Sequence, residues 1–217
     1  MATGYSPKIV TDGLVLYIDA ANPKSYPGSG TTWSDLAGSN NGTLTNGPTF
    51  DSGNGGSISF DGSNDYIDNI LIQSSSAMTW EAVVYPESLS RNVFLNGFNP
   101  RISLRNYQIN LYHTKPDRDG DIGFTYNFQG GRYYHIVVTY DSSNGYRGYV
   151  NAEEKTRTIA GNGAAGKPEF NSTKVGISAG SEGYFDGKIP LVKIYNKALT
   201  AAEIQQNYNA LKGRYGL

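Results

Sequence analysis

Short runs of alternating apolar and polar residues recur along the chain, and clusters of turn residues separate them. In 13–20 and 79–86 successive side chains fall on two different faces, and a period of two predicts β-strands. Residues 133–140 are apolar on both faces, which is typical of a central strand covered on each side. Further strands are predicted at 57–60, 101–113 (with a bend near Asn106), 121–128, 145–152, 173–178 and 188–196.

One segment, 199–213, has the pattern of a helix. Thr200 followed three residues later by Glu203 is a capping box, in which each side chain accepts a hydrogen bond from the other residue's backbone N–H. Three apolar residues then fall on one helical face, and Gly213 is predicted to cap the C-terminal end. The three are Ile204, Tyr208 and Leu211. We expect this helix to lie on the sheets as a lid.

These elements predict an all-β protein, an antiparallel sandwich of two sheets with a short C-terminal helix. We expect a single domain over 1–217, in which 1–12 form an N-terminal extension. The stretches 21–50 and 152–171 are predicted as long loops, and loops of more than about 12–15 residues in a compact domain are usually functional. Trp33 is predicted to anchor the first of these loops to a sheet.

Composition and charge narrow the class of protein. Lys+Arg 18 against Asp+Glu 19 gives a formal net charge of −1 without a basic run, so nucleic acid is not expected as a partner. The chain has no cysteine, and its core therefore needs no disulfide. Its start lacks the apolar region of a signal peptide, and no apolar run is long enough to span a bilayer. We expect a soluble protein without a signal peptide and without membrane insertion.

Several segments, in this order, resemble the laminin-G-like or concanavalin A-like lectin/glucanase family. They are "GLVLYIDA", "SISFDGSNDYI", "MTWEAVVYP", "GRYYHIVVTYD" and "YFDGKIPLVKIYNKALTAAEI". The resemblance implies a jelly roll with a concave face and rim loops that often bind glycans. The N-terminal and C-terminal segments are similar to a subtype found in virion proteins of tailed bacteriophages, where such domains lie on fibres, necks or capsid surfaces.

Two positions depart from the family pattern. Pro190 stands where the family usually has an acidic residue, and a proline cannot donate a hydrogen bond to a neighbouring strand, so an edge or a bulge is expected there. Asn151-Ala152 replaces an Asn-Gly pair, which weakens the prediction of a type I′ hairpin turn.

The stretch "FDGSNDYID" places three carboxylates within nine residues. It is not an EF-hand, because Tyr66 and Ile72 stand where that loop needs glycine and glutamate. One interpretation is a corner between strands, in which Asp61 caps turn amides. The other follows from the resemblance and is a structural calcium that uses Asp61 or Asp65, with Asp19 as a further candidate ligand. No cofactor is required in either case.

A second acidic run is interpreted as an exposed hairpin tip, with weak calcium binding as the alternative; it comprises Asp117, Asp119 and Asp121. Glycan recognition is predicted elsewhere, because aromatic rings match the apolar face of a pyranose and Asn, Arg and His side chains reach its hydroxyls. The candidate residues are Asn96, Arg101, Arg105, Tyr107, Tyr112 and His113. The alternative is a solvated outer face on which tyrosines pack across strands.

Catalytic chemistry has weak support in the sequence. Glu81 is the only acid within a core strand, whereas retaining glycosidases need two carboxylates about 5 Å apart. We expect Glu81 to be satisfied by a neighbouring side chain. His135 corresponds to a structural histidine of the resembled family, and we interpret it as a hydrogen-bonded core residue. The protein is therefore predicted not to be an enzyme.

The preferred hypothesis is a non-enzymatic virion surface or appendage protein, extracellular after cell lysis, whose lectin-like module binds cell-surface glycans in host adhesion. A second hypothesis is a purely structural virion protein that binds other viral subunits without sugar. A glycan hydrolase is the third. A homo-oligomer is compatible with each of them.

Overall fold

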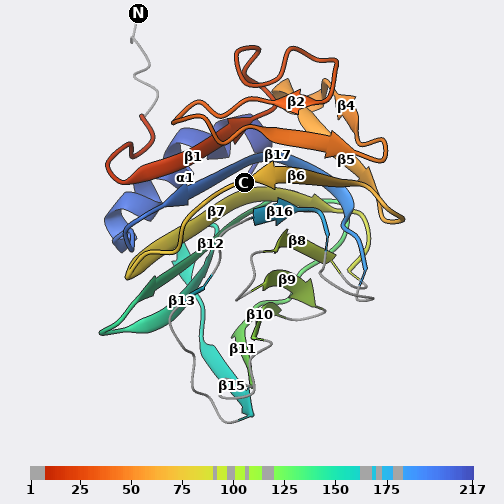
Figure 1. Ribbon diagram of the computed structural model, residues 1–217. Coiled ribbons are helices and arrows are strands. Elements are labelled where there is room, and N and C mark those ends of the chain that lie inside the picture. The colour runs from red at the N-terminus through yellow and green to blue at the C-terminus, as the bar shows by residue number, and fades with distance from the viewer. Residues whose placement is uncertain are drawn as a thin grey trace, which may run out of the picture.

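Two antiparallel sheets lie face to face, and a helix covers the outer side of one of them (Figure 1). The computed structural model of the protein describes residues 8–89, 92–96, 101–105, 108–113, 120–161, 168–169, 173–177 and 183–217. The predicted all-β sandwich with a C-terminal helix is confirmed. Within the described residues, no helix is long and apolar enough to cross a membrane.

The strands are named here in their spatial order. In the first sheet this order is β14 (Glu153–Glu154), β13 (Gly145–Val150), β12 (Tyr134–Asp141), β7 (Ala77–Pro86), β17 (Asp186–Tyr195), β5 (Ser57–Asp61) and β4 (Thr49–Asp51), and β1 (Leu14–Asp19) also pairs with β17. In the second sheet it is β15 (Arg157–Gly161), β11 (Gly120–Thr125), β10 (Gln108–His113), β9 (Arg101–Arg105), β8 (Asn92–Asn96), β16 (Thr173–Val175), β6 (Tyr66–Ile70), β3 (Gly42–Thr45) and β2 (Thr32–Trp33).

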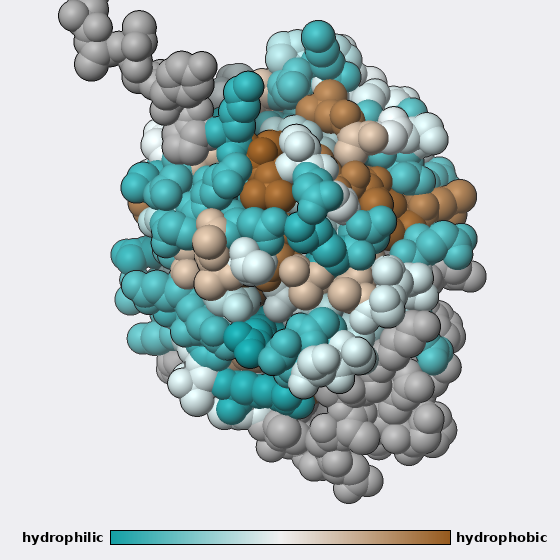
Figure 2. Space-filling model, turned by 90° about the vertical axis from the view of Figure 1, so that its left-hand side faces the viewer, coloured by the Kyte–Doolittle hydropathy of each residue, from teal (hydrophilic) through white to brown (hydrophobic). Residues whose placement is uncertain are grey.

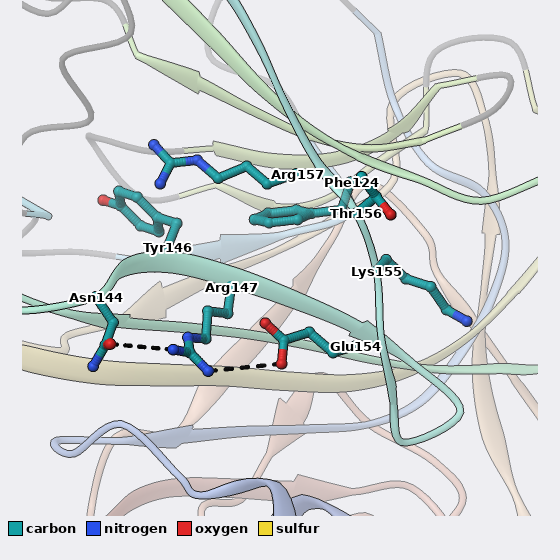
Figure 3. A pocket seen from close by; sticks show the side chains of 8 residues that line it. All are labelled: Phe124, Asn144, Tyr146, Arg147, Glu154, Lys155, Thr156 and Arg157. Atoms are coloured by element: carbon teal, nitrogen blue, oxygen red, sulfur yellow. Dashed lines mark hydrogen bonds and ion pairs between the residues drawn. The ribbon is translucent and has the colours of Figure 1, made fainter.

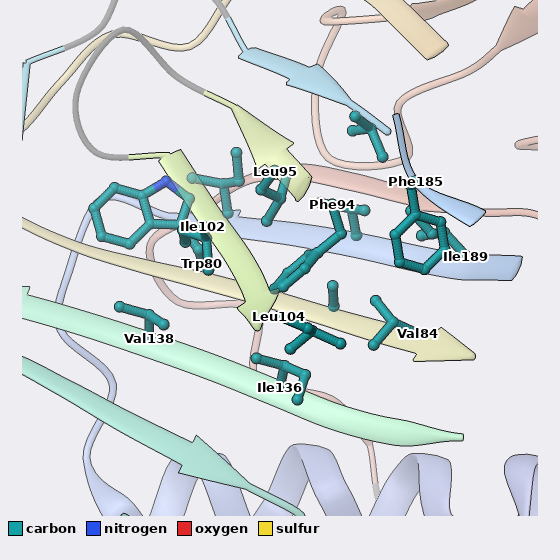
Figure 4. Close-up of a cluster of buried hydrophobic side chains, with 14 of the residues drawn as sticks. Trp80, Val84, Phe94, Leu95, Ile102, Leu104, Ile136, Val138, Phe185 and Ile189 are labelled. Carbon is teal, nitrogen blue, oxygen red and sulfur yellow. The ribbon is translucent and has the colours of Figure 1, made fainter. Parts of the chain in front are cut away.

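The hydrophobic core fills the space between the two sheets. Ile102 and Leu104 point into it from β9, and Ile136 and Val138 point into it from β12 in the opposite sheet (Figure 4). Because side chains alternate along a strand, the remaining residues of β9 lie on the outer face of the second sheet. The alternation in the sequence therefore distinguishes the core face of β9 from its outer, polar face.

The helix α1 (Ala201–Tyr215) packs on the outer face of the first sheet. Thr200 and Glu203 form the predicted capping box. The C-terminal end differs from the prediction: the helix continues through Gly213 and ends at Gly216, which has a φ of 66°. The buried stripe differs as well, since it consists of Ile204, Asn207, Leu211 and Tyr215, while Tyr208 is only half-buried.

The stretches predicted as long loops contain strands. Residues 21–50 include β2 and β3, as well as the start of β4, and residues 152–171 include β14 and β15. These strands have two to five residues, so their alternation is too short to be recognised in the sequence. Trp33 is fully buried in the core, which confirms its predicted role as an anchor.

Both departures from the family pattern have a visible structural result. The pairing of β17 with β7 shifts between Lys188 and Leu191, so the bulge expected around Pro190 is present in a central strand. Asn151 and Ala152 have φ values of 52° and 66° and connect β13 to β14, where Val150 pairs with Glu153. A two-residue turn with positive φ at both positions is therefore formed without glycine.

The aspartate-rich stretch forms a corner at which the chain leaves β5 in the first sheet and enters β6 in the second. The Asp61 carboxylate accepts hydrogen bonds from the backbone N–H groups of Ser63 and Asn64 at 2.8 and 3.3 Å. Asp65 in turn accepts one from the N–H of Asp61 at 3.1 Å. The corner interpretation is confirmed by these contacts.

Candidate functional site

The structure brings together three of the six residues that the sequence predicts to bind glycans. Asn96 of β8 pairs with Arg101 of β9, and Arg101 pairs with Tyr112 of β10. Directly paired residues point to the same face of a sheet, so the three form one row on the outer face of the second sheet. The Arg101 guanidinium lies 4.0 Å from the centroid of the Tyr112 ring, close enough for a cation–π interaction.

This row is largely closed to a ligand. Asn96 and Arg101 are only 7% and 6% exposed, and Tyr112 is half-buried. Arg105 lies exposed at the end of β9. Tyr107, Asp117 and Asp119 are outside the described residues, and His113 and Asp121 are described only for their backbone. We call Asn96, Arg101 and Tyr112 the Arg101 row. Glycan binding at this row stays a prediction.

The three predicted metal ligands do not lie together. Asp61 and Asp65 meet at the corner, whereas Asp19 ends β1 and is buried against Arg214 of α1 at 2.9 Å. Asp19 also accepts a hydrogen bond from the Tyr17 hydroxyl at 2.8 Å. Among the residues that the structure describes, no group of three or more acidic or histidine side chains is arranged to hold a metal. A structural calcium therefore remains a prediction.

Glu81 is fully buried beneath the helix and has several partners. Its carboxylate receives hydrogen bonds from the Lys193 ammonium at 2.8 Å, from Nε2 of His135 at 2.9 Å and from the Asn207 amide at 2.6 Å. Burial alone would raise the pKa of Glu81, but Lys193 and His135 lower it to about 2. The prediction that neighbours satisfy Glu81 is confirmed, as is the hydrogen-bonded core position of His135.

An open cleft lined by tyrosines lies where the C-terminal end of α1 meets the first sheet. It has a volume of about 530 Å³. The residues that line it are Asn54, Tyr85, Tyr126, Gly131, Arg132, Tyr133, Tyr134, Asn151, Tyr215, Gly216 and Leu217. We call it the tyrosine cleft.

Three elements position the rings of the tyrosine cleft. Tyr85 stands near the end of β7, Tyr133 precedes β12, and Tyr215 closes α1. The ring centroids of Tyr85 and Tyr133 are 4.8 Å apart, and those of Tyr133 and Tyr215 are 5.3 Å apart. These distances are typical of contacting aromatic rings. Tyr85 and Tyr133 are half-buried, so part of each ring is accessible from the cleft.

Polar side chains lie beside the rings of the tyrosine cleft. The Asn54 amide donates to the Tyr133 hydroxyl at 3.4 Å, and Arg132 is exposed. The rings of Tyr85 and Tyr133 are tilted by 56° to one another, so each offers its own accessible part to a ligand. Aromatic rings beside amide and guanidinium donors provide both kinds of contact that a sugar ring needs.

A second cleft, which we call the edge cleft, lies where the chain crosses from β14 in the first sheet to β15 in the second. It has a volume of about 490 Å³ and is lined by Phe124, Asn144, Tyr146, Arg147, Glu154, Lys155, Thr156 and Arg157. Arg147 bonds to Asn144 and Glu154 on the β13–β14 side (Figure 3). Arg157 extends from the β15 side.

The sequence analysis missed both clefts. The residues of the tyrosine cleft are spread over 54–217 and those of the edge cleft over 124–157, and neither set forms a recognisable motif. The one available signal was composition, because 17 tyrosines are more than a strand pattern alone requires. Composition does not reveal which of them are neighbours in space.

Comparison with known proteins places this geometry in a family. A family model described as the concanavalin A-like lectin/glucanases superfamily matches residues 52–205. The chain belongs to this superfamily. No curated protein sequence matches the chain.

Solved structures share the fold of this superfamily member at low sequence identity. Domain 4 of AbnA, a GH43 extracellular arabinanase from Geobacillus stearothermophilus, was solved in complex with arabinotriose; it is 19% identical with a TM-score of 0.67, and the match covers 90% of this chain and 98% of that one. Trypanosoma rangeli sialidase is 16% identical with a TM-score of 0.65, over 93% of this chain and 33% of that one. The chain thus spans about a third of the sialidase.

Proposed function

We propose that this chain is a non-enzymatic carbohydrate-binding module and that the tyrosine cleft receives the sugar. The observation that carries this proposal is the row of contacting rings formed by Tyr85, Tyr133 and Tyr215 in an open cleft. The apolar face of a pyranose stacks on such rings, while Arg132 and Asn54 donate hydrogen bonds to its hydroxyls.

The comparisons support a sugar as the ligand class. The superfamily is described by its lectins and glucanases, and a domain with the same fold was solved with arabinotriose bound. The volume of about 530 Å³ lies within the range of small-molecule pockets, which is about 300–1,000 Å³.

The acidic residues of the clefts favour binding without hydrolysis. Glu154 is the one carboxylate among the side chains that line the two clefts, and it is paired with Arg147. Glycoside hydrolysis by the usual mechanism needs two carboxylates on opposite sides of the bond. Release of reducing ends from a polysaccharide by the purified chain would overturn this part of the proposal.

The exposed apolar area of the surface also bears on the second hypothesis, a purely structural protein that binds other subunits without sugar. A protein that only joins other subunits would present a broad apolar contact area. Leu71, at 63% exposure, is the one large hydrophobic residue that lies in the exposed class among the described residues. Figure 2 shows hydrophobic residues as small separate areas among hydrophilic ones on one side of the molecule. This favours glycan binding, while a place in a virion and a role in host adhesion remain predictions.

The experiment is a printed glycan array probed with the full chain, followed by titration of the strongest neutral oligosaccharide with variants. Tyr133→Ala is expected to weaken binding by about two- to tenfold, because a stacking contact of this kind is worth roughly 0.5–1.5 kcal/mol. Tyr133→Phe keeps the ring and is expected to bind almost as the unchanged chain does. Thermal melting verifies that both variants are folded.

Tyr112→Ala is the matched control, because it removes a half-buried tyrosine from the predicted Arg101 row. It is expected to leave binding unchanged. If Tyr112→Ala lost affinity for the oligosaccharide and Tyr133→Ala kept it, the sugar would bind on the outer face of the second sheet. That result would contradict the proposed role of the tyrosine cleft.

A further inference from the structure

The edge cleft and the tyrosine cleft are neighbours. Lys155 lines the edge cleft, and its ammonium lies 5.1 Å from the ring centroid of Tyr126, which lines the tyrosine cleft. In Figure 3, Lys155 points away from the other residues of the edge cleft. A backbone hydrogen bond of 3.0 Å from Thr125 to Thr156 joins the two walls at this point. The Lys155–Tyr126 contact is therefore the point at which the linings of the two clefts meet.

Positive charge dominates the linings of the two clefts. Four positively charged side chains line the clefts, namely Arg132, Arg147, Lys155 and Arg157, against one negatively charged side chain, Glu154. Arg147 is bonded to Glu154 at 3.7 Å, and Lys155 is paired at 2.7 Å with Glu153, just outside the lining. The remaining cations are Arg132 in the tyrosine cleft and Arg157 in the edge cleft.

Arg157 is the cation of the edge cleft that has no carboxylate partner among the described residues. Its side chain is exposed, and within the described residues its guanidinium makes no hydrogen bond or ion pair. The group lies over Gly145: a Cβ atom at that glycine would be 3.4 Å from Nη1 of Arg157. A planar guanidinium with free donors matches carboxylate and sulfate oxygens, which it binds through two parallel hydrogen bonds.

We propose that the edge cleft is an anion-binding subsite that extends the tyrosine cleft, and that the preferred ligand is therefore an acidic oligosaccharide. One sugar stacks on the tyrosines, and a carboxylate or sulfate on a unit further along the chain binds Arg157. This inference rests on the proposed function, because it assigns a ligand class to the same surface.

The test uses an array that pairs each acidic glycan with its neutral counterpart, a carboxyl-reduced form for uronic acids and a desulfated form for sulfated glycans. The unchanged chain is expected to bind the acidic member about tenfold more tightly, which corresponds to about 1.4 kcal/mol. The uronic acid and sulfate pairs show which anion is preferred. Higher salt is expected to reduce the difference, because exposed charges are screened.

Arg157→Ala is expected to lose about tenfold in affinity for the acidic member and to bind the neutral member unchanged. Arg157→Lys keeps the charge but not the two-pronged geometry, and an intermediate loss is expected. The matched control is Lys24→Ala, which removes one exposed positive charge from the turn after β1, outside the lining of both clefts, and is expected to change neither affinity.

The two proposals fail in different ways. Equal binding of acidic and neutral members, with a loss of both in Tyr133→Ala, would contradict the anion subsite and retain the tyrosine cleft. A preference for acidic members that Arg157→Ala leaves intact would also overturn the subsite. An array without any bound glycan would contradict the proposed function and this inference together.

Discussion

Glu81 holds together three elements that are far apart in the sequence. Lys193 belongs to β17, His135 to β12 and Asn207 to α1, and each donates to its carboxylate. A carboxylate with this low a pKa accepts hydrogen bonds, so Nε2 of His135 carries the proton of their shared bond. All four side chains are fully buried. Removal of the Glu81 charge would leave the buried Lys193 ammonium without an opposite charge to compensate it.

Glu81→Gln is therefore expected to lower the free energy of unfolding by about 3–5 kcal/mol, measured by urea denaturation at pH 7. Glu153→Gln is the control, since it removes an exposed ion pair with Lys155 and is expected to leave the stability nearly unchanged, because solvent screens such pairs. Similar stability of the two variants would contradict a structural role of the buried network.

The stability of the protein is also expected to depend on pH through Glu81. Its pKa is 4.5 in the reference state and about 2 in the folded chain. The unfolded state binds the proton more readily, so the contribution is present above about pH 4.5 and is lost as the pH falls toward 2. This contribution is roughly 3 kcal/mol. Urea denaturation at pH 6 and pH 3 measures roughly two thirds of it, because the loss is complete only below pH 2. The part due to Glu81 is the part that Glu81→Gln abolishes.

At the scale of elements, the hairpin between β13 and β14 is formed against local preference. Ala152 has a φ of 66°, in the left-handed region that side chains with a Cβ disfavour by roughly 1–2 kcal/mol. The pairing of Val150 with Glu153 imposes this conformation, because the chain has to reverse within two residues before it crosses to β15. The same crossing forms the edge cleft.

Ala152→Gly is expected to stabilise the protein by about 0.5 kcal/mol, since glycine adopts a positive φ without strain but loses more entropy on folding. The measurement is the shift of the urea midpoint. Ala202→Gly, on the exposed side of α1, is the control and is expected to destabilise by up to about 1 kcal/mol. A destabilised Ala152→Gly variant would mean that the packing of the methyl group outweighs the backbone strain.

At the scale of the whole molecule, the buried polar residues of the Arg101 row and the two open clefts lie on different parts of the sandwich. Asn96 and Arg101 on the outer face of the second sheet are buried, while the two clefts lie where the sheets, the hairpin and the end of α1 meet. The corner at Asp61 and the Asp19–Arg214 pair hold chain segments together through their own hydrogen bonds and charges. These carboxylates already have protein partners.

We therefore expect the melting temperature to be the same, within about 1 °C, in excess EDTA and in millimolar calcium chloride, because a ligand that does not bind the folded state adds no stability. Differential scanning calorimetry of the full chain measures it, with magnesium chloride as the control for ionic strength. A rise of several degrees with calcium alone would support the structural ion at the aspartates.

The sequence by itself determined the two-layer β architecture and the start of the helix, and it predicted a corner at Asp61 and an edge or a bulge at Pro190. Each of these depends on residues that are close along the chain: alternation within a strand, a capping box, short side-chain hydrogen bonds to turn amides, and a missing N–H. The core position of Trp33 also follows from its size and hydrophobicity.

Only the tertiary structure decided where α1 ends, which of its faces is buried, and which polar residues meet. Asn207 is buried because Glu81 lies opposite, and the helix continues past Gly213 because Leu211 and Tyr215 pack on Val83 and Leu191. The tyrosine cleft combines residues from β7, β12 and α1, whose approach depends on the strand order. Contacts between distant segments leave no local pattern, so the site follows from the fold.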